Sequence, residues 1–183
     1  MTEKNSMQYS NQSGLWLLLM IFFGVISRLI PHLPNMTPLI SLSIIANIKL
    51  NRWYAMAAMV IILLVSDSLL SLLFKYPVLH HWSYFTYSGF LINTWLFSDQ
   101  SRARFQGLFF SALAGTLLFW IWTNFGVWLT TALYTKTFHG FLLCYFAALP
   151  FLRNALIGSM IWITVYYFTL NPFSKKSSRE FAG

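Results

Sequence analysis

Residues 53–74 read WYAMAAMVIILLVSDSLLSLLF and carry a single charged residue, Asp67. A helix that crosses a bilayer needs about 20 mostly apolar residues, so this run predicts a membrane-spanning helix. The whole chain has a similar character, because 57% of its 183 residues are hydrophobic and only 9% are charged. An ordinary soluble domain carries about 25% charged residues. The sequence therefore predicts an all-α integral membrane protein with a single domain.

Apolar blocks on both sides of this run predict about six transmembrane helices in total. The predicted spans are residues 15–30, 38–48, 53–74, 82–97, 105–127 and 151–170. Pro150 divides the last apolar stretch, because a proline inside a helix removes a backbone hydrogen bond and kinks the helix. Residues 137–149 are therefore predicted to form a re-entrant or interfacial segment before the last helix. The transmembrane domain, residues 14–171, lies between a polar tail (1–13) and a basic tail (172–183).

The basic residues predict the orientation of the chain in the membrane. Of the 12 Lys and Arg residues, eight lie in the terminal tails and the even-numbered connections, and four lie in or near the odd-numbered connections. Cytoplasmic loops of membrane proteins carry an excess of Lys and Arg, so this split predicts that both termini are cytoplasmic. The net charge of +8 does not predict nucleic-acid binding, because the basic residues occur singly or in pairs between apolar blocks.

Charged residues inside the spans are the first candidates for a functional site. Asp67 is the only acid within a span, and Arg28 and Arg153 are the only bases embedded in the predicted outer half. A charge in hydrocarbon costs roughly 2.5–3.5 kcal/mol, so it usually faces a partner or a wet cavity. We expect Asp67 to pair with one of the two arginines. The pair is either purely structural, or it leaves the second arginine free to bind an anionic or polar ligand.

Other polar residues cluster near the predicted outer ends of the helices. A rigid turn at residues 33–38 contains Asn35, and the two pairs Arg28/His32 and Asn124/Trp128 are each spaced four apart, as on one helix face. The predicted ligand-binding residues are Arg28, His32, Asn35, Asp67, Asn124, Trp128, Arg153 and Asn154.

The sequence contains no signature of an enzyme or of a metal centre. The phosphate-binding loop, HExxH and G-x-S-x-G motifs are all missing, and one in-span acid cannot supply a pair of catalytic carboxylates. The four histidines have no familiar ligand spacing, and Cys144 lies in an apolar block that favours a packing role. We therefore expect no catalytic residues, no metal and no cofactor.

Four stretches resemble a family of small bacterial inner-membrane proteins that are described as transport proteins. They are RLIPHLPNMTP (28–38), Ser66-Asp67, TNFGVW (123–128) and CYFAALPFLRN (144–154), which is followed by Gly158. That family is in turn similar to the substrate-binding subunits of energy-coupling-factor vitamin transporters. The resemblance implies the bacterial inner membrane, six helices, cytoplasmic termini and an outward-facing ligand pocket beneath the first loop.

The resemblance also has departures that bear on mechanism. Substrate-binding subunits commonly carry an Ala-x-x-x-Ala contact in helix one for a separate energising module, and residues 15–24 have no such pair. The family usually has an acid where this chain has Ser159. We expect an uptake or binding subunit for a small vitamin- or cofactor-like molecule, embedded in the lipid bilayer, with or without an energising module. The alternative is a structural or assembly protein that packs with a larger complex and has no ligand of its own.

Overall fold

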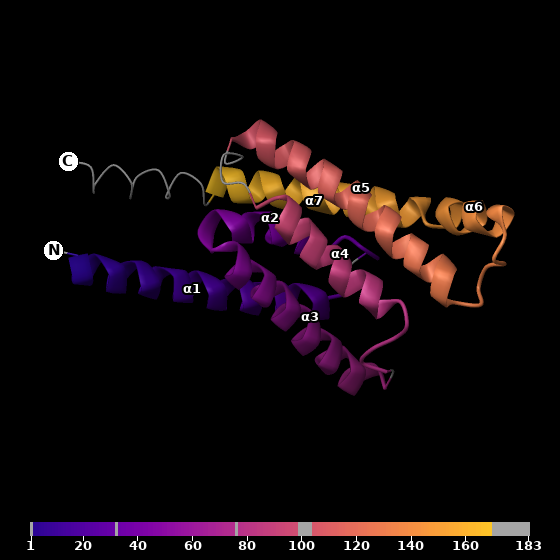
Figure 1. Cartoon of the computed structure of the whole chain (residues 1–183), viewed down its shortest axis with the longest axis horizontal. Helices are drawn as coiled ribbons and strands as arrows, with labels where there is room; N and C mark the ends of the chain where they lie inside the picture. Colours follow the sequence, from indigo (N-terminus) through magenta and orange to yellow (C-terminus); the bar gives the residue numbers. More distant parts are fainter. Residues whose placement is uncertain (1, 32, 76, 99–103, 170–183) are drawn as a thin grey trace.

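Helices are the regular secondary structure of the part of the chain that the structure describes, as the apolar blocks predict. The structure is a computed structural model that describes residues 2–31, 33–75, 77–98 and 104–169, with side chains from residue 14 onward. The helices are α1 (Thr2–Leu29), α2 (Leu39–Lys49), α3 (Arg52–Phe74), α4 (Ser83–Leu96), α5 (Phe105–Thr130), α6 (Phe138–Ala147) and α7 (Leu149–Thr169). They form one elongated bundle, in which α1 begins at the same end as α7 finishes (Figure 1).

The short helix α2 occupies the centre of the bundle. It contacts α1, α3, α4, α5 and α7, and its residues from Leu39 to Asn47 are all buried. Its side chains join a hydrophobic core that includes Ile62, Leu108 and Ile163 from three different helices. Its polar side chains Ser41, Ser43 and Asn47 are buried as well, because the faces of α2 meet five other helices.

A non-helical segment, residues 33–38, leads into α2 and packs against α7. Asn154 donates a hydrogen bond from Nδ2 to the carbonyl oxygen of Pro34 at 3.2 Å. A β-carbon placed on Gly158 would lie only 3.2 Å from the backbone of Met36, so the missing side chain permits this close approach. One turn into α2, Ser41 donates to the carbonyl oxygen of Ser159 at 2.9 Å. The stretches 28–38 and 144–158, both singled out in the sequence, therefore hold each other in place.

Among the described residues, three helices are long and apolar enough to cross a membrane, fewer than the six predicted. They are α3, α5 and α7. With 11 and 14 residues, α2 and α4 measure roughly 17 and 21 Å, against a hydrocarbon core about 30 Å thick. The apolar part of α1, Gly14–Leu29, is also shorter than the required length. The all-helical class is confirmed, whereas helix length supports only half of the predicted spans.

The last apolar stretch breaks beside Pro150, as predicted, but it does not fold back. Ala148 alone separates α6 from α7 and keeps a right-handed helical conformation. Its N–H donates to the carbonyl oxygen of Cys144 at 3.2 Å, and Leu152 donates to the carbonyl oxygen of Ala148 at 3.0 Å. The helical hydrogen bonding thus continues almost through the break, and α6 prolongs α7 toward the end of the bundle opposite the start of α1 (Figure 1). A re-entrant segment reverses its direction inside the membrane, and the backbone from α6 to α7 does not reverse.

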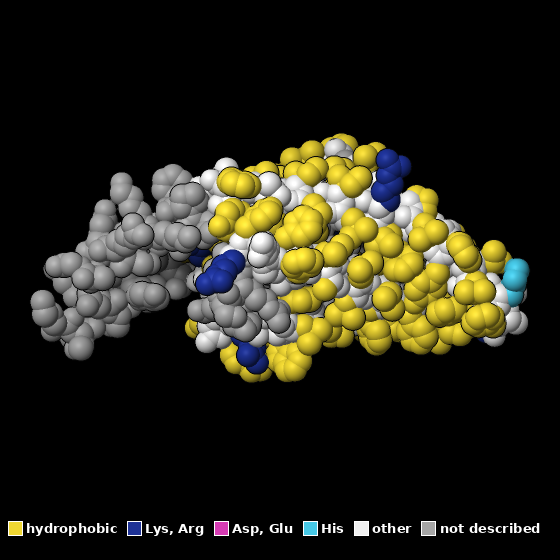
Figure 2. Space-filling model, turned by 90° about the horizontal axis from the view of Figure 1, so that it is seen from above, with side chains coloured by type: hydrophobic (Ala, Val, Ile, Leu, Met, Phe, Trp, Pro, Cys, Tyr) yellow, Lys and Arg dark blue, Asp and Glu magenta, His cyan; other side chains and the backbone are white. Residues whose placement is uncertain are grey.

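The described surface of the bundle is predominantly apolar. Leu18 on α1, Leu72 on α3, Phe110 on α5 and Phe168 on α7 are each more than 60% exposed. Hydrophobic side chains cover most of the described part of the face in Figure 2, with only a few Lys and Arg side chains in view. Soluble monomers rarely expose apolar patches of this extent. Together with the three candidate spans, this surface indicates a membrane protein.

Candidate functional site

Asp67 forms an ion pair with Arg28. Asp67 lies on α3 about two turns before that helix ends, and Arg28 lies in the last turn of α1. Arg28 Nη2 is 2.7 Å from Asp67 Oδ1, and the two side chains are 19% and 16% exposed. Of the two arginines that the sequence left open as partners for Asp67, the structure selects Arg28.

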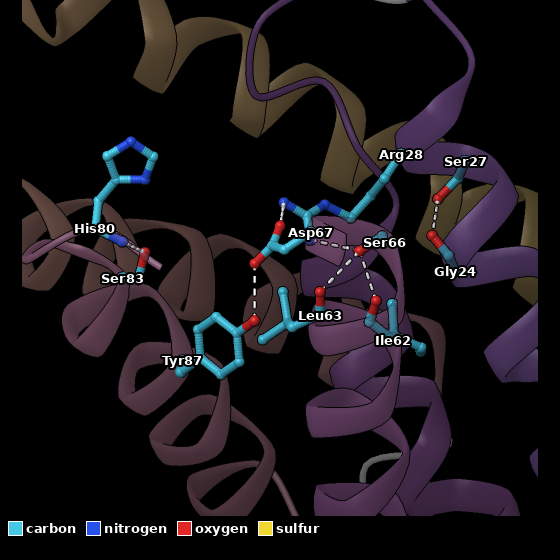
Figure 3. A network of polar contacts seen from close by, with 10 residues as sticks. All are labelled: Gly24, Ser27, Arg28, Ile62, Leu63, Ser66, Asp67, His80, Ser83 and Tyr87. Atoms are coloured by element: carbon cyan, nitrogen blue, oxygen red, sulfur yellow. Dashed lines mark hydrogen bonds and ion pairs between the residues drawn. The ribbon is translucent and has the colours of Figure 1, made fainter. Parts of the chain in front are cut away.

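Ser66 and Tyr87 extend the ion pair into a network that joins three helices (Figure 3). Arg28 donates from Nη1 to Ser66 Oγ at 2.6 Å, and the Ser66 hydroxyl donates to the carbonyl oxygen of Ile62 at 2.5 Å. From α4, the Tyr87 hydroxyl donates to Asp67 Oδ2 at 2.8 Å. Both carboxylate oxygens therefore accept a hydrogen bond, and the network links α1, α3 and α4.

A polar cavity of about 390 Å³ lies beside this network, and we call it the ion-pair cavity. Its lining residues are Arg28, Asp67, Val78, His80, Trp82, Ser83, Thr86 and Tyr87. They come from the last part of α1 and α3, from the α3–α4 connection and from the start of α4. This places the cavity toward the end of the bundle opposite the start of α1. Its volume falls within the range of small-molecule sites, about 300–1,000 Å³.

The α3–α4 connection supplies an aromatic wall to the ion-pair cavity. The rings of His80 and Trp82 stack with centroids 4.3 Å apart. The backbone N–H of His80 donates to Ser83 Oγ at 2.9 Å, which ties the connection to the first turn of α4. In Figure 3, His80 and Ser83 lie on the side of the network away from Arg28. The cavity thus presents charged groups on one side and aromatic rings on another.

A second cavity of about 300 Å³ lies among α5, α6, the start of α7, the α5–α6 connection and the segment 33–38, and we call it the loop cavity. Its lining residues are Asn35, Asn124, Val127, Leu133, Tyr134, Cys144, Ala147, Ala148 and Phe151. None of these residues carries a formal charge at pH 7. Asn35 has a φ of 63°, in the left-handed region that asparagine tolerates better than most residues.

Two further predicted residues hold the segments that line the loop cavity. Asn154 fixes the segment 33–38 through its bond to Pro34. Trp128 Nε1 donates to the carbonyl oxygen of Thr135 at 3.1 Å, and Lys136 Nζ donates to the carbonyl oxygens of Trp128 and Thr131. These bonds fold the α5–α6 connection back over the end of α5. Asn154 and Trp128 therefore act as positioning residues for this cavity.

The predicted site residues consequently divide between two places. Arg28 and Asp67 line the ion-pair cavity, while Asn35 and Asn124 line the loop cavity. Arg153 is exposed and lines neither of these cavities. His32 lies outside the residues that the structure describes. The described residues of the predicted set therefore do not all line one of these two cavities.

Sequence reasoning missed the cavity residues contributed by the α3–α4 connection and α4. The block that contains Ser83, Thr86 and Tyr87 was predicted only as a short apolar span. The sequence does contain one signal for these residues. Ser83 and Tyr87 both carry a hydroxyl group and are four residues apart, so they share one face of a helix. Within the described residues, no three His, Cys, Asp or Glu side chains gather closely enough to hold a metal ion.

These observations indicate a helical membrane protein whose described residues form the ion-pair cavity and the loop cavity toward one end of the bundle. The model of a family of unknown function, DUF6580, matches residues 8–179, and the chain belongs to that family. No curated protein and no solved structure matches the chain.

Proposed function

We propose that this chain is a transport protein that binds a small molecule for uptake, and that the ligand occupies the ion-pair cavity. One observation carries the proposal. A partly exposed Arg28–Asp67 pair lines a polar cavity inside a bundle whose described surface is predominantly apolar. Charged residues are costly within a membrane and commonly mark a substrate pathway. The role is that of a binding protein rather than an enzyme.

The proposed topology has six passes through the bacterial inner membrane, with both termini in the cytoplasm. The start of α1 and the end of α7 lie at one end of the bundle, which an even number of passes requires (Figure 1). Residues 36–38, which are partly or fully buried, form the second pass together with α2, and non-helical backbone is tolerated at membrane depth where it is buried in protein. With this orientation the ion-pair cavity faces outward. A vitamin- or cofactor-sized ligand then enters from outside, with or without a separate energising module to complete transport.

One feature of the site favours the alternative, a structural or assembly protein without a ligand. Both oxygens of Asp67 have partners, and the network ties α1, α3 and α4 together. Such a brace fixes helix packing without any ligand, and buried polar groups have set helix register in other proteins. The two roles differ in whether a molecule occupies the cavity.

Mass spectrometry of the purified protein distinguishes the two roles. We expect a small molecule to be released on denaturing the wild-type protein, at a stoichiometry near one per chain. The double variant Arg28→Gln/Asp67→Asn removes both charges at once and should release much less, about a tenth or below. Arg153→Gln is the matched control, because that arginine is exposed and outside both cavities.

Absence of any released molecule from the wild-type protein, together with no saturable binding from a metabolite library, would support the assembly role instead. Equal release from the wild-type protein and the double variant would move the ligand away from the ion-pair cavity. In that case Asn124→Ala in the loop cavity is the variant to compare next.

A further inference from the structure

The charges that line the ion-pair cavity cancel each other. Arg28 and Asp67 are its formally charged lining residues when histidine is neutral, and they lie 2.7 Å apart. The sequence suggested a free arginine for an anionic ligand, but Arg153 is exposed and is not part of this lining. The cavity therefore offers one positive and one negative group side by side, with no surplus of either sign among its described residues.

Both charged groups keep capacity to bind a ligand. A guanidinium group has five N–H donors, and among the described residues Arg28 uses one toward Asp67 and one toward Ser66. A carboxylate accepts at about four lone-pair positions, and Asp67 receives bonds from Arg28 and Tyr87 among the described residues. Each group can therefore contact a ligand of opposite charge without breaking the existing network.

The environment disfavours a ligand that carries a net charge. Arg28 and Asp67 are more than four-fifths buried, and a single extra charge there would lack a compensating partner. Removing an ion from water costs several kcal/mol unless it is paired and hydrogen-bonded. A ligand with an ammonium and a carboxylate group has no net charge. Its carboxylate can contact Arg28, and its ammonium group can contact Asp67.

We propose that the ion-pair cavity binds a zwitterionic, amino-acid-like molecule, with its carboxylate on Arg28 and its ammonium group on Asp67. This inference rests on the proposed function, since it names the class of ligand for the same cavity. Val78 and the stacked rings of His80 and Trp82 line the cavity as well. They provide an apolar and aromatic wall for the side group of the ligand.

Two sets of matched probes test this inference on the purified full-length protein in detergent at pH 8. One set is L-phenylalanine, 3-phenylpropanoate and 2-phenylethylamine, and the other is L-leucine, 4-methylpentanoate and 3-methylbutylamine. In each set the zwitterion, anion and cation share the same side group. We expect at least one zwitterion to raise the melting temperature in a saturable manner, with an apparent Kd at least about tenfold lower than its two charged analogues.

Variants then locate the binding. Arg28→Gln/Asp67→Asn should abolish the shift caused by the zwitterion, whereas Arg153→Gln should preserve it. If the double variant does not fold, the ranking of zwitterion, anion and cation on the wild-type protein still decides. The inference is overturned if an anion or cation binds as tightly as its zwitterion, if no zwitterion binds, or if the double variant retains the shift.

The failure of this inference is distinguishable from the failure of the proposed function. A co-purified molecule that is uncharged or singly charged, and that is lost in the double variant, would retain the uptake role and exclude the zwitterion. If no molecule co-purifies and no probe binds, both the zwitterion inference and the proposed uptake function are excluded.

Discussion

At the scale of single residues, the Arg28–Asp67 pair makes a specific prediction about stability. Asp67→Asn leaves a largely buried guanidinium without its counter-ion, while the amide can still accept the hydrogen bond from Tyr87. Removing one partner of a buried pair costs roughly 3–5 kcal/mol, and access to water in the cavity lowers this. We expect the free energy of unfolding to fall by about 2–3 kcal/mol, measured by denaturation in detergent micelles.

The double variant supplies the control for this prediction. Arg28→Gln added to Asp67→Asn leaves no unpaired charge, so it should recover more than half of the loss, because residues in contact are not additive. The exposed Arg153, changed to Gln, should alter stability by less than about 0.5 kcal/mol. An unchanged melting temperature for Asp67→Asn alone would show that this carboxylate contributes nothing to the bundle.

The sequence identifies the candidate residues better than it identifies their partners. Asp67 stands out because it is the only acid in an apolar block, which requires no knowledge of the fold. Its pairing with Arg28 rather than Arg153 depends on which helices are neighbours, and the apolar pattern does not contain that information. Tyr87 contributes to the site through one hydroxyl on an aromatic ring, and a sequence of this composition has many such residues.

At the scale of elements, the helix boundaries are well predicted except at the start of α1, which begins at Thr2 instead of near residue 15, and the helix lengths across the membrane are predicted less well. The break at Pro150 follows from proline chemistry, and the structure places it within one turn of the start of α7. The predicted second span, residues 38–48, coincides with α2 but has only 11 helical residues. The hydropathy of the sequence shows that these residues are apolar. It does not show whether neighbouring helices or lipid surround them.

The close contact between α6 and the connection that precedes it can be tested with one glycine. A β-carbon on Gly140 would overlap the carbonyl oxygen of Thr135, whereas a β-carbon on Gly14 would meet nothing within 4 Å. We expect Gly140→Ala to lower the free energy of unfolding by about 1–3 kcal/mol, because the backbone must shift. The same change at Gly14 should leave it equal or raise it by up to about 1 kcal/mol, through helix propensity alone.

Chemical denaturation of the two variants under identical conditions provides the comparison. Equal effects at the two positions would mean that the α5–α6 connection adapts without cost. Because Leu133 and Tyr134 of this connection line the loop cavity, a displaced connection should also change the reactivity of Cys144 toward thiol reagents.

At the scale of the whole molecule, the proposed topology predicts the location of three points on the chain. Reporter fusions at Arg104 and after residue 183 should both report the cytoplasm, and a fusion at Val78 should report the opposite side. The physical reason is the excess of Lys and Arg in the tails and even-numbered connections. A periplasmic signal from either of the first two fusions would overturn the orientation or the number of passes.

The central position of α2 has a consequence for the order in which the protein matures. An 11-residue helix is too short to remain stably in a bilayer by itself, and α2 carries Ser41, Ser43 and Asn47 on its buried surface. Its covering includes α7, and the hydrogen bond from Ser41 reaches Ser159 on that helix. In the described chain, α7 is the last helix to leave the ribosome. In the nascent protein, α2 therefore lacks part of its final covering until α7 has been synthesised. The interval between the synthesis of α2 and that of α7 is therefore the stage at which a membrane chaperone or a quality-control protease would have the most to recognise.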